Sequence, residues 1–579
     1  MRSRLVGLAA MLLLGCREQP PGPTVVEPAS AKLAAKPAAR PAEPIASLAR
    51  FQDATSTSGV NFTYRDGQEA GHFSILESLG GGVALFDYDG DGALDVFVPG
   101  GGSFDSSQQV LGLPGALFHN EGRLIFENVT VPAGVYLAPH YSHGAAVGDF
   151  DGDGFPDLLV TGYGGLSLFH NQGDGTFFET ARDCGLTDAL WSSSAGWGDL
   201  NGDGVLDLYV VHYVDWSFDN DPFCTATNGA HRDICPPKKF AGLPDVLYFG
   251  VGDGTFRDAS VEARLMPVGK PPELSAYDID KGLGVLLADV DLDGDLDIYV
   301  ANDTVPKFLY RNRGNGVFDE VAGQSGTALS DTANADGSMG LDIGDFNNDG
   351  LPDLWVTNYE RECLGLYRND GNGQFLHVSR AAGVTAVGSQ FVSFGTLFLD
   401  FDRDGDEDIF VTNGHVVRYP INSPVKQLPL LFENRGGRFV NVAPAAGPYL
   451  AEPHLGRGVA AGDLDNDGDV DLVLSPINEP AVILLNESAN ANHWLRVQLI
   501  GVKSQRDAVG ALVTLSTSAG QQIRQVKGGG SYLSQSELHC FFGMPEDAEL
   551  EQLTIRWPSG TVQEVTDLTR DRSIIVIEK

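Results

Sequence analysis

A nine-residue acidic motif recurs seven times along this chain of 579 residues. The copy at residues 149–157 reads D-F-D-G-D-G-F-P-D. Ca²⁺ binds six to eight oxygen ligands in flexible geometry. Oxygens at positions one, three, five and nine, with a glycine at position six for a sharp turn, fit that requirement. An EF-hand loop needs glutamate at position twelve and flanking helices, so the spacing predicts a calcium loop of another kind.

The predicted metal ligands are the residues at positions one, three, five and nine of each copy, and we number the copies loops 1 to 7 in chain order. They are Asp87, Asp89, Asp91 and Asp95; Asp149, Asp151, Asp153 and Asp157; Asp199, Asn201, Asp203 and Asp207; Asp289, Asp291, Asp293 and Asp297; Asp345, Asn347, Asp349 and Asp353; Asp400, Asp402, Asp404 and Asp408; and Asp463, Asp465, Asp467 and Asp471. The formal net charge of the chain is −40. We expect about one Ca²⁺ per loop, up to seven, because bound cations relieve the repulsion inside each loop.

The same acids return in every loop, which indicates structural metal binding and not catalysis. A paired-carboxylate hydrolase needs two acids in unlike environments. The sequence also has no nucleophile elbow, Walker A loop or H-E-x-x-H motif. The strong negative charge repels phosphate backbones, which excludes nucleic acid as an expected partner.

The segments around each loop predict an all-β fold. Short apolar runs flank the loops, as at residues 143–148 and 158–160, and predict an antiparallel strand pair joined by the metal loop. A glycine-rich hairpin such as 168–177 follows in the first six units. Four short strands repeated seven times predict a seven-bladed β-propeller. The seventh unit lacks its last strand, so residues 51–55 and 59–62 are expected to complete that blade and close the ring.

Two regions depart from the repeat. The interval between loops 3 and 4 contains an insertion at about 216–244, which is either functional or merely tolerated. Cys224 and Cys235 within it lie close enough for a local disulfide, with free thiols as the alternative. The pairing of Cys184, Cys363 and Cys540 stays open. After the propeller at 48–490, apolar alternating runs in residues 491–579 predict a small β-sandwich.

The N-terminus predicts export and a lipid anchor. Residues 1–15 combine two arginines with a short apolar run and read as a signal peptide that ends before Cys16. The sequence Leu13-Leu14-Gly15-Cys16 resembles a bacterial lipobox, which implies a lipidated Cys16; an ordinary signal peptide is the alternative. Residues 16–47 form a Pro/Ala-rich spacer. We therefore expect the protein at the outer membrane or cell surface, touching membrane only through the lipid.

Two sets of motifs resemble known families. The loop-and-hairpin units are similar to FG-GAP or VCBS repeats, the type that builds the propeller of integrin α chains. The tail, with Gly528-Gly-Gly-Ser-Tyr-Leu-Ser-Gln535 and Trp557-Pro-Ser-Gly560, resembles the ASPIC/UnbV domain, although Cys540-Phe-Phe-Gly543 departs from its glycine-rich pattern. Together they resemble a bacterial relative of the cartilage acidic protein family. The resemblance implies a secreted, calcium-binding protein and supplies no reaction.

Several polar residues follow the second strand of a predicted blade and are expected to converge on one face. They are Asn302, Asp303, Asn358, Asn413 and His415, and they form the predicted ligand face. The sequence therefore favours a non-enzymatic binding, adhesion or assembly module for a protein or glycan partner. The alternative is a glycan-binding or hydrolytic enzyme with its site on the propeller face or in the insertion.

Overall fold

A computed structural model describes residues 47–226, 229–265 and 280–579. The chain divides into two compact units, Met1–Ile45 and Ala46–Lys579, and the described residues belong to the second. The predicted signal peptide, Cys16 and the spacer up to residue 46 lie outside the described residues. Within the described ranges, no helix is long and apolar enough to cross a membrane.

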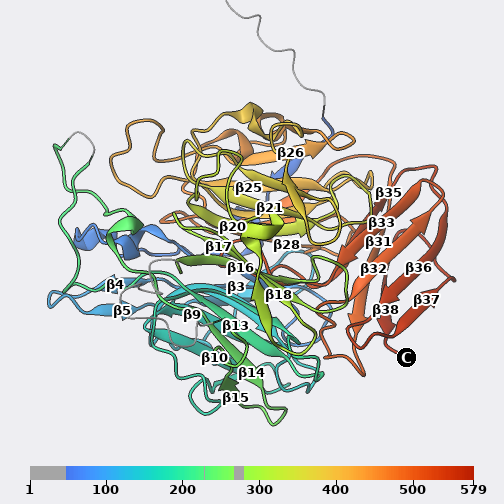
Figure 1. The fold of residues 1–579 in the computed structure, drawn as a ribbon, viewed down its shortest axis with the longest axis horizontal. Coiled ribbons are helices and arrows are strands. Elements are labelled where there is room, and N and C mark those ends of the chain that lie inside the picture. Colours follow the sequence, from blue (N-terminus) through green and yellow to red (C-terminus); the bar gives the residue numbers. More distant parts are fainter. Residues whose placement is uncertain (1–46, 227–228, 266–279) are drawn as a thin grey trace, which may run out of the picture. The chain divides into compact units, whose positions relative to one another are not determined.

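Seven antiparallel sheets form the blades of a propeller in the described part of the chain, six of them four-stranded and that of blade 4 extended by a fifth strand, β34 (Gly528–Gly529) (Figure 1). Blades 1 to 3 are β2 (Ala84–Phe86), β3 (Asp95–Val98), β6 (Ala116–Asn120) and β7 (Phe126–Asn128); β8 (Tyr141–Gly148), β9 (Asp157–Tyr163), β10 (Gly165–Asn171) and β11 (Phe177–Glu179); and β12 (Ser192–Gly198), β13 (Asp207–His212), β14 (Val246–Gly250) and β15 (Phe256–Asp258). The hairpin β4 (Gly102–Phe104) and β5 (Val110–Gly112) extends from blade 1.

Blades 4 to 7 continue the same order. They are β16 (Gly282–Ala288), β17 (Asp297–Asn302), β18 (Phe308–Asn312) and β19 (Phe318–Glu320); β20 (Ser338–Gly344), β21 (Asp353–Asn358), β22 (Gly365–Asn369) and β23 (Phe375–His377); β24 (Ser393–Leu399), β25 (Asp408–Asn413), β26 (Leu430–Asn434) and β27 (Phe439–Asn441); and β28 (Gly458–Gly462), β29 (Asp471–Ser475), β30 (Val482–Asn486) and β1 (Phe51–Asp53). In every blade the acidic loop joins the first two strands, which confirms the predicted hairpins. Helices are short, as in α1 (Thr55–Ser58) and α2 (Ala322–Ser325).

The N-terminal strand closes the ring as predicted. Strand β1 pairs with β30, and Phe51 lies opposite Asn486. Phe51 is buried in the core of blade 7 with Leu484. The innermost strands contact one another in order, and β28 contacts β2. The first and last parts of the propeller are therefore joined in one blade.

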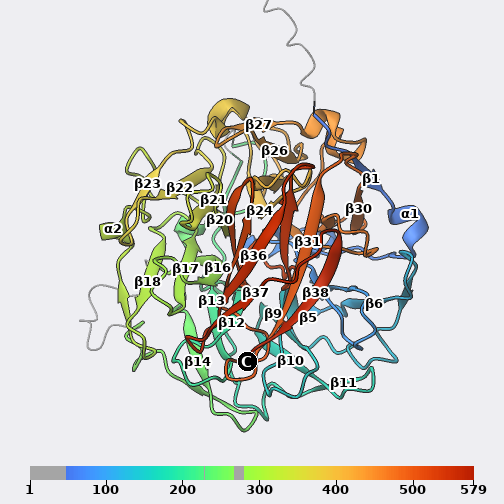
Figure 2. The same cartoon turned by 90° about the vertical axis from the view of Figure 1, so that its right-hand side faces the viewer.

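The C-terminal region forms the predicted sandwich. One sheet contains β31 (His493–Ile500), β35 (Cys540–Met544) and β38 (Arg572–Ile577), and the other contains β32 (Leu512–Thr517), β33 (Gly520–Gln525), β36 (Leu550–Arg556) and β37 (Val562–Val565). Figure 2 shows these strands in front of the blades. Their apolar faces merge into one core with blades 3 and 4.

Residues 527–538 leave this sandwich and occupy the centre of the ring; we call them the plug. Strand β34 (Gly528–Gly529) pairs with β16, Ser531 bridges to Leu341, and Gln535 bridges to Ala84. Further hydrogen bonds tie the plug to β8, β12, β24 and β28. The plug therefore contacts the innermost strand of all seven blades, and the chain itself fills the propeller axis.

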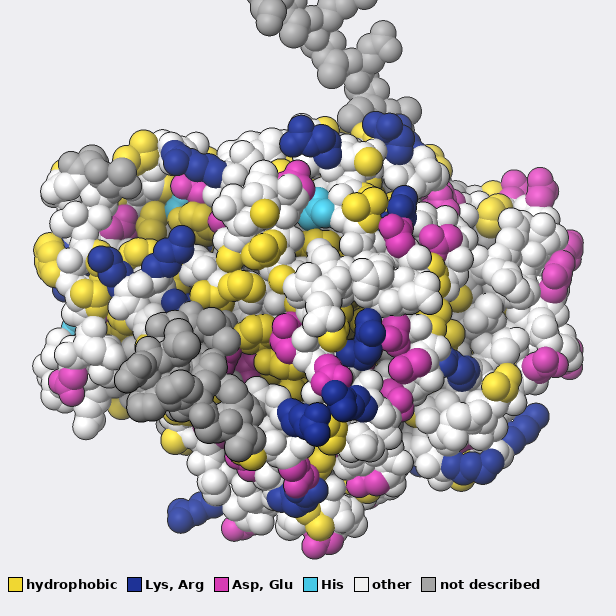
Figure 3. All heavy atoms as spheres, in the orientation of Figure 1, with side chains coloured by type: hydrophobic (Ala, Val, Ile, Leu, Met, Phe, Trp, Pro, Cys, Tyr) yellow, Lys and Arg dark blue, Asp and Glu magenta, His cyan; other side chains and the backbone are white. Residues whose placement is uncertain are grey.

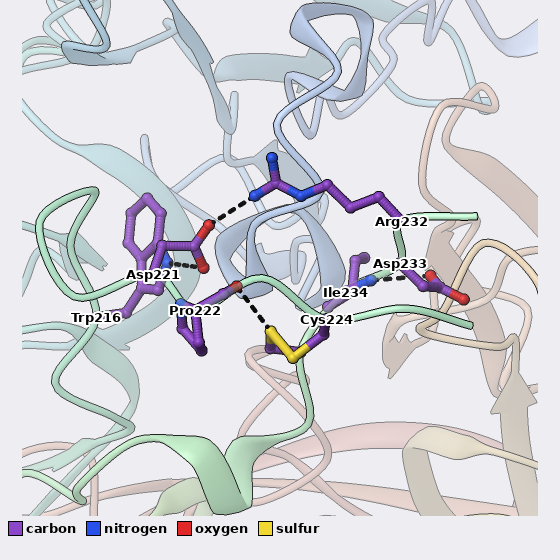
Figure 4. Close-up of a disulfide and its surroundings, with 8 residues drawn as sticks. Trp216, Asp221, Pro222, Cys224, Arg232, Asp233 and Ile234 are labelled. Carbon is purple, nitrogen blue, oxygen red and sulfur yellow. Dashed lines mark hydrogen bonds and ion pairs between the residues drawn. A yellow bond between two sulfur atoms is a disulfide. The ribbon is translucent and has the colours of Figure 1, made fainter. Parts of the chain in front are cut away.

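Three segments cover the face opposite the acidic loops, and we call their described residues the cap: 64–79, 213–226 with 229–245, and 414–427. In an antiparallel blade the connection between strands two and three lies on the other face from the connection between strands one and two. The insertion follows β13 and therefore lies on that face. The carboxylate of buried Asp233 accepts hydrogen bonds from the backbone N–H groups of Arg418 and Tyr419. A disulfide joins Cys224 to Cys235 beside this contact (Figure 4).

Candidate functional site: seven acidic loops

All seven loops fold around the carboxylate at position one. In loop 1, the Asp87 Oδ1 atom accepts a hydrogen bond from the backbone N–H of Asp91 (3.1 Å), and Oδ2 accepts one from Gly92 (2.9 Å). The same pair recurs in loops 2 to 7. Gly92 has a φ of 88°, a left-handed conformation that favours glycine. This explains why glycine stands at position six in every copy.

The carboxylate at position nine is fully enclosed. Asp95 Oδ2 accepts a hydrogen bond from the N–H of Tyr88, and Oδ1 accepts one from the N–H of Asn120 in the third strand. The position-nine residues of all seven loops are at most 2% exposed. The residues at positions three and five are partly or fully exposed in each loop. Each loop thus combines a buried carboxylate at position nine with solvent-accessible side chains at positions three and five.

The donor set fits a hard divalent cation. Ligand atoms of Asp149, Asp151 and Asp157 lie within 4.8 Å of one another, and loops 1 and 4 contain similar groups. Buried Asp353 Oδ2 has no hydrogen-bond partner. A buried, unpaired carboxylate oxygen costs several kcal/mol unless a cation compensates it. Ca²⁺ in these loops would accept such oxygens and bring positive charge to the acidic rows.

Burial changes the protonation of these acids in the cation-free chain. Burial, with added repulsion from Asp151 and Asp149, raises the pKa of Asp157 to about 9. Burial likewise raises the pKa values of Asp207 and Asp353 to about 8. A bound cation has to displace these protons, so cation affinity should rise with pH.

This linkage predicts opposite pH dependences with and without calcium. In EGTA, the folded state holds protons that the unfolded chain releases near pH 4, so stability should fall as pH rises from about 4 to about 8. In excess calcium the carboxylates are ionised and ligated, so stability should fall on acidification. Calorimetric melting temperatures at several pH values would measure both slopes. Parallel slopes would contradict cation binding by these acids.

In six of the seven blades, an asparagine clamps the acidic loop to the loop of the preceding blade. Asn369 donates from Nδ2 to the carbonyl of Pro352 in its own loop (3.0 Å) and to that of Val290 in loop 4 (2.8 Å). Six blades have such an asparagine at the end of the third strand: Asn120, Asn171, Asn312, Asn369, Asn434 and Asn486. Blade 3 has Gly250 there. The clamps couple neighbouring loops around the ring.

The C-terminal sandwich holds three of the loops by a repeated two-point contact. At loop 4, Gln525 Oε1 accepts the N–H of Asp289 (3.0 Å), and Arg556 Nη2 contacts Asp289 Oδ2 (2.6 Å). In loop 2, the Asp507 carboxylate accepts the N–H of Asp149, and Arg506 lies near the Asp149 carboxylate. In loop 7, Glu537 and Arg496 make the same two contacts with Asp463. The sandwich therefore docks on position one of loops 2, 4 and 7.

Most residues of the predicted ligand face are buried and form hydrogen bonds within the protein. Asn302, Asn358 and Asn413 are at most 2% exposed, and each donates from Nδ2 to a carbonyl of its own blade. Asp303 accepts a hydrogen bond from the Tyr213 hydroxyl (2.6 Å). Burial lowers the pKa of His415 to about 4. The three asparagines close strand ends, and the structure does not bring these five residues together around an open cavity.

Sequence reasoning missed the clamp asparagines and the arginines of the sandwich. Five of the six asparagines have a signal, because each begins the turn of the glycine-rich hairpin in its unit, whereas Asn486 lies in the seventh unit, which lacks that hairpin. The arginines Arg496, Arg506 and Arg556 have none, since they lie at unrelated offsets in strands and loops of a separate sheet pair.

Family comparisons agree with this architecture. The FG-GAP-like repeat pattern matches residues 99–210, 289–356, 345–411 and 400–474, more than half of the chain, and the ASPIC and UnbV pattern matches residues 501–579. The chain is 25% identical to cartilage acidic protein 1 of Mus musculus over 496 residues, 83% of this chain and 70% of that protein. The human protein is 24% identical over 500 residues, 83% of this chain and 69% of the relative.

Solved structures resemble the chain only distantly. One match is a lectin of Agrocybe aegerita that recognises non-reducing terminal N-acetylglucosamine. The alignment spans 66% of this chain and 82% of the lectin, with 18% identity and a TM-score of 0.36. The alignment with the rhamnogalacturonan lyase YesW spans 70% of this chain and 82% of the lyase, with 13% identity and a TM-score of 0.30. Superpositions this poor carry no functional argument.

Proposed function

Because this chain belongs to the FG-GAP repeat family and carries a C-terminal ASPIC and UnbV domain, we propose that it is a calcium-stabilised, non-enzymatic binding module. The lipobox-like sequence before Cys16 supports a lipid-anchored, extracytoplasmic location. In this proposal Ca²⁺ holds the seven loops in one conformation. The clamp asparagines couple neighbouring loops, and the sandwich packs on the face that carries the loops. The partner is a protein or a glycan on the outside of the cell.

The filled axis is the observation that carries the binding-module proposal. Tyr532 and Leu533 of the plug occupy the central channel and are at most 1% exposed there. On the cap side, Arg457 is buried across the channel and donates to the carbonyls of Ser78 and Gly414. The cap covers one end of the axis, whereas a cavity lined by β20, β24, the plug and the sandwich lies beside the other end. We place the partner on the outer surface of the propeller, where the cap is the part that departs most from the repeat.

The cap exposes aromatic and apolar side chains. Phe223 is 73% exposed, Ile421 58% and Tyr419 41%. The His231 ring stacks on Tyr419 with centroids 4.7 Å apart, and the Arg232 guanidinium lies 5.5 Å from the Phe223 ring centroid. In Figure 3, hydrophobic and basic side chains mix on the left-hand side of the view. Aromatic and arginine side chains are enriched in binding hot spots, which makes this surface the proposed contact area.

We expect the Phe223→Ala/Tyr419→Ala variant to lose binding by at least about tenfold, since two hot-spot rings contribute on the order of 2 kcal/mol or more. The soluble fragment from Ser47 would be tested in calcium against glycan arrays and against intact cells. The control is Phe178→Ala, which removes a ring that is 65% exposed on the outer strand of blade 2. Equal losses in both variants would contradict a partner site on the cap.

A further inference from the structure

One position beside each acidic loop differs from blade to blade. It is the residue immediately before the clamp asparagine in the third strand, and before Gly250 in blade 3. In chain order it is His119, His170, Phe249, Arg311, Arg368, Glu433 and Leu485. The backbone around it is the same in all blades, because the next residue donates its N–H to the position-nine aspartate. The seven blades are therefore a natural set of substitutions at one site.

This position reaches the metal loop. In blade 4, Arg311 Nε lies 3.1 Å from Asp291 Oδ2, the carboxylate at position three of loop 4. In blade 1, His119 Nδ1 lies 3.4 Å from Asp89 Oδ2 and 3.2 Å from Asp95 Oδ1. An arginine here adds a fixed positive charge to the loop, whereas a histidine adds a nitrogen that can ligate a metal.

His170 occupies the same position at loop 2. Its Nε2 atom lies 2.9 Å from Asp151 Oδ2 and 3.9 Å from Asp153 Oδ2. Despite the short contact, this buried nitrogen makes no hydrogen bond, because its geometry does not direct an N–H at the oxygen. Two atoms at this separation without a hydrogen bond are arranged as two ligands of one ion would be. Two ligand atoms about 2.0–2.1 Å from a tetrahedral metal ion lie about 3.3 Å apart, between the two distances at His170.

The surroundings of His170 suit a metal ligand. The Gln172 side-chain amide lies 3.2 Å from Nδ1, and turning its oxygen toward the ring would let it accept the Nδ1 proton. That outer hydrogen bond leaves Nε2 free for a metal and fixes the ring. The ring also packs edge-on against Phe150, with centroids 5.5 Å apart. His119 packs in the same way on Tyr88, at 5.9 Å.

From these contacts we propose that loops 1 and 2 form mixed imidazole–carboxylate sites for a divalent transition metal such as Zn²⁺. The ligands are His119, Asp89 and Asp95 in loop 1, and His170, Asp151 and Asp153 in loop 2. Imidazole nitrogen favours Zn²⁺ and its neighbours, whereas Ca²⁺ takes oxygen ligands. The other five loops lack a nitrogen ligand at this position and favour calcium, whereas in loops 1 and 2 the transition metal would take the place that the proposed function gives to Ca²⁺. The inference rests on the proposal that the loops hold cations.

Co²⁺ is the probe that tests it, added to the full chain in excess calcium so that all loops can be filled. We expect about two equivalents to bind, with a visible d–d spectrum of a nitrogen-containing site, and Zn²⁺ to displace them. His170→Ala should lose about one equivalent, and His119→Ala/His170→Ala should lose both. Arg311→His, which places an imidazole beside loop 4, should gain one. His493→Ala, in β31 of the sandwich and paired with Asp571, is the control and should bind Co²⁺ as the unaltered chain does.

Absence of Co²⁺ binding in calcium, or binding that survives the double substitution, would overturn the proposal. The melting temperature of each variant in calcium and in EGTA is read separately. Calcium-dependent melting without Co²⁺ binding would leave the proposed function standing and refute the transition-metal sites. If both were missing, the loops themselves would not be cation sites.

Discussion

Chelation of calcium with EGTA is expected to abolish the cooperative melting transition of this protein at neutral pH. A site held at a thousand times its dissociation constant adds about 4 kcal/mol to the stability of the folded state. Folded domains are typically stable by only about 5–15 kcal/mol. Several loops occupied at that level would therefore contribute as much free energy as the entire net stability of a typical folded domain. Differential scanning calorimetry with and without EGTA measures the effect, and re-addition of calcium should restore the transition.

The effect should spread beyond the loops. Each emptied loop leaves a position-nine aspartate that is at most 2% exposed without the cation that would ligate it. The clamp asparagines join one loop to the next, and the sandwich grips loops 2, 4 and 7 through their position-one aspartates. Disorder in one loop would therefore loosen the neighbouring blade and the docked sandwich. Blades should melt together and not one at a time.

Single-loop substitutions separate this effect from chelation in general. Asp353→Asn removes the buried charge of loop 5 and should lower the number of bound calcium ions by about one, as counted by isothermal titration. Glu551→Gln is the matched control, because it makes the same acid-to-amide change at an exposed residue of β36 outside the acidic loops. A melting temperature that EGTA leaves unchanged in the unaltered chain would refute the calcium role outright.

The blades and their closure could be predicted because their signals are local. Strand, acidic loop and hairpin lie within one unit, and the unit repeats seven times. Even the displaced strand at Phe51 was visible, since its pattern is missing from the last unit. Ligand positions one, three, five and nine follow from the same spacing. Their common geometry is a property of a single chain segment with glycine at its turn.

Contacts between distant segments could not be predicted in this way. The plug was visible only as a glycine-rich motif of the tail, and nothing in Gly528–Gly529 indicates a partner strand more than two hundred residues away. The predicted ligand face failed for a related reason. Asn302, Asn358 and Asn413 follow equivalent strands, but their amides satisfy local backbone carbonyls. Position along a strand indicates which face a residue reaches, and packing decides whether it stays accessible.

Gly82→Ala is expected to expel the plug or to destabilise the protein by several kcal/mol. Gly82 lies just before β2, and a Cβ atom there would sit 1.6 Å from the carbonyl oxygen of Leu533 in the plug. Both partners are backbone, so rotation of a side chain cannot relieve the collision. Overpacking of a tight core typically costs about 1–3 kcal/mol, and a collision with main chain costs more. Limited proteolysis should then release the sandwich, and the melting temperature in calcium should fall.

Gly323→Ala in α2 is the matched control, because a Cβ atom there meets nothing within 4 Å and its φ is compatible with alanine. Alanine favours helix over glycine by about 1 kcal/mol, so this variant should melt at the same temperature or slightly higher. The contrast isolates the collision from the chemical change, which is one methyl group in both variants. If Gly82→Ala behaved like Gly323→Ala, the plug would not fill the axis in solution. A ligand could then bind in the central channel. If it melted early and lost its calcium response as well, the plug would be the element through which the sandwich and the seven loops act as one folded unit.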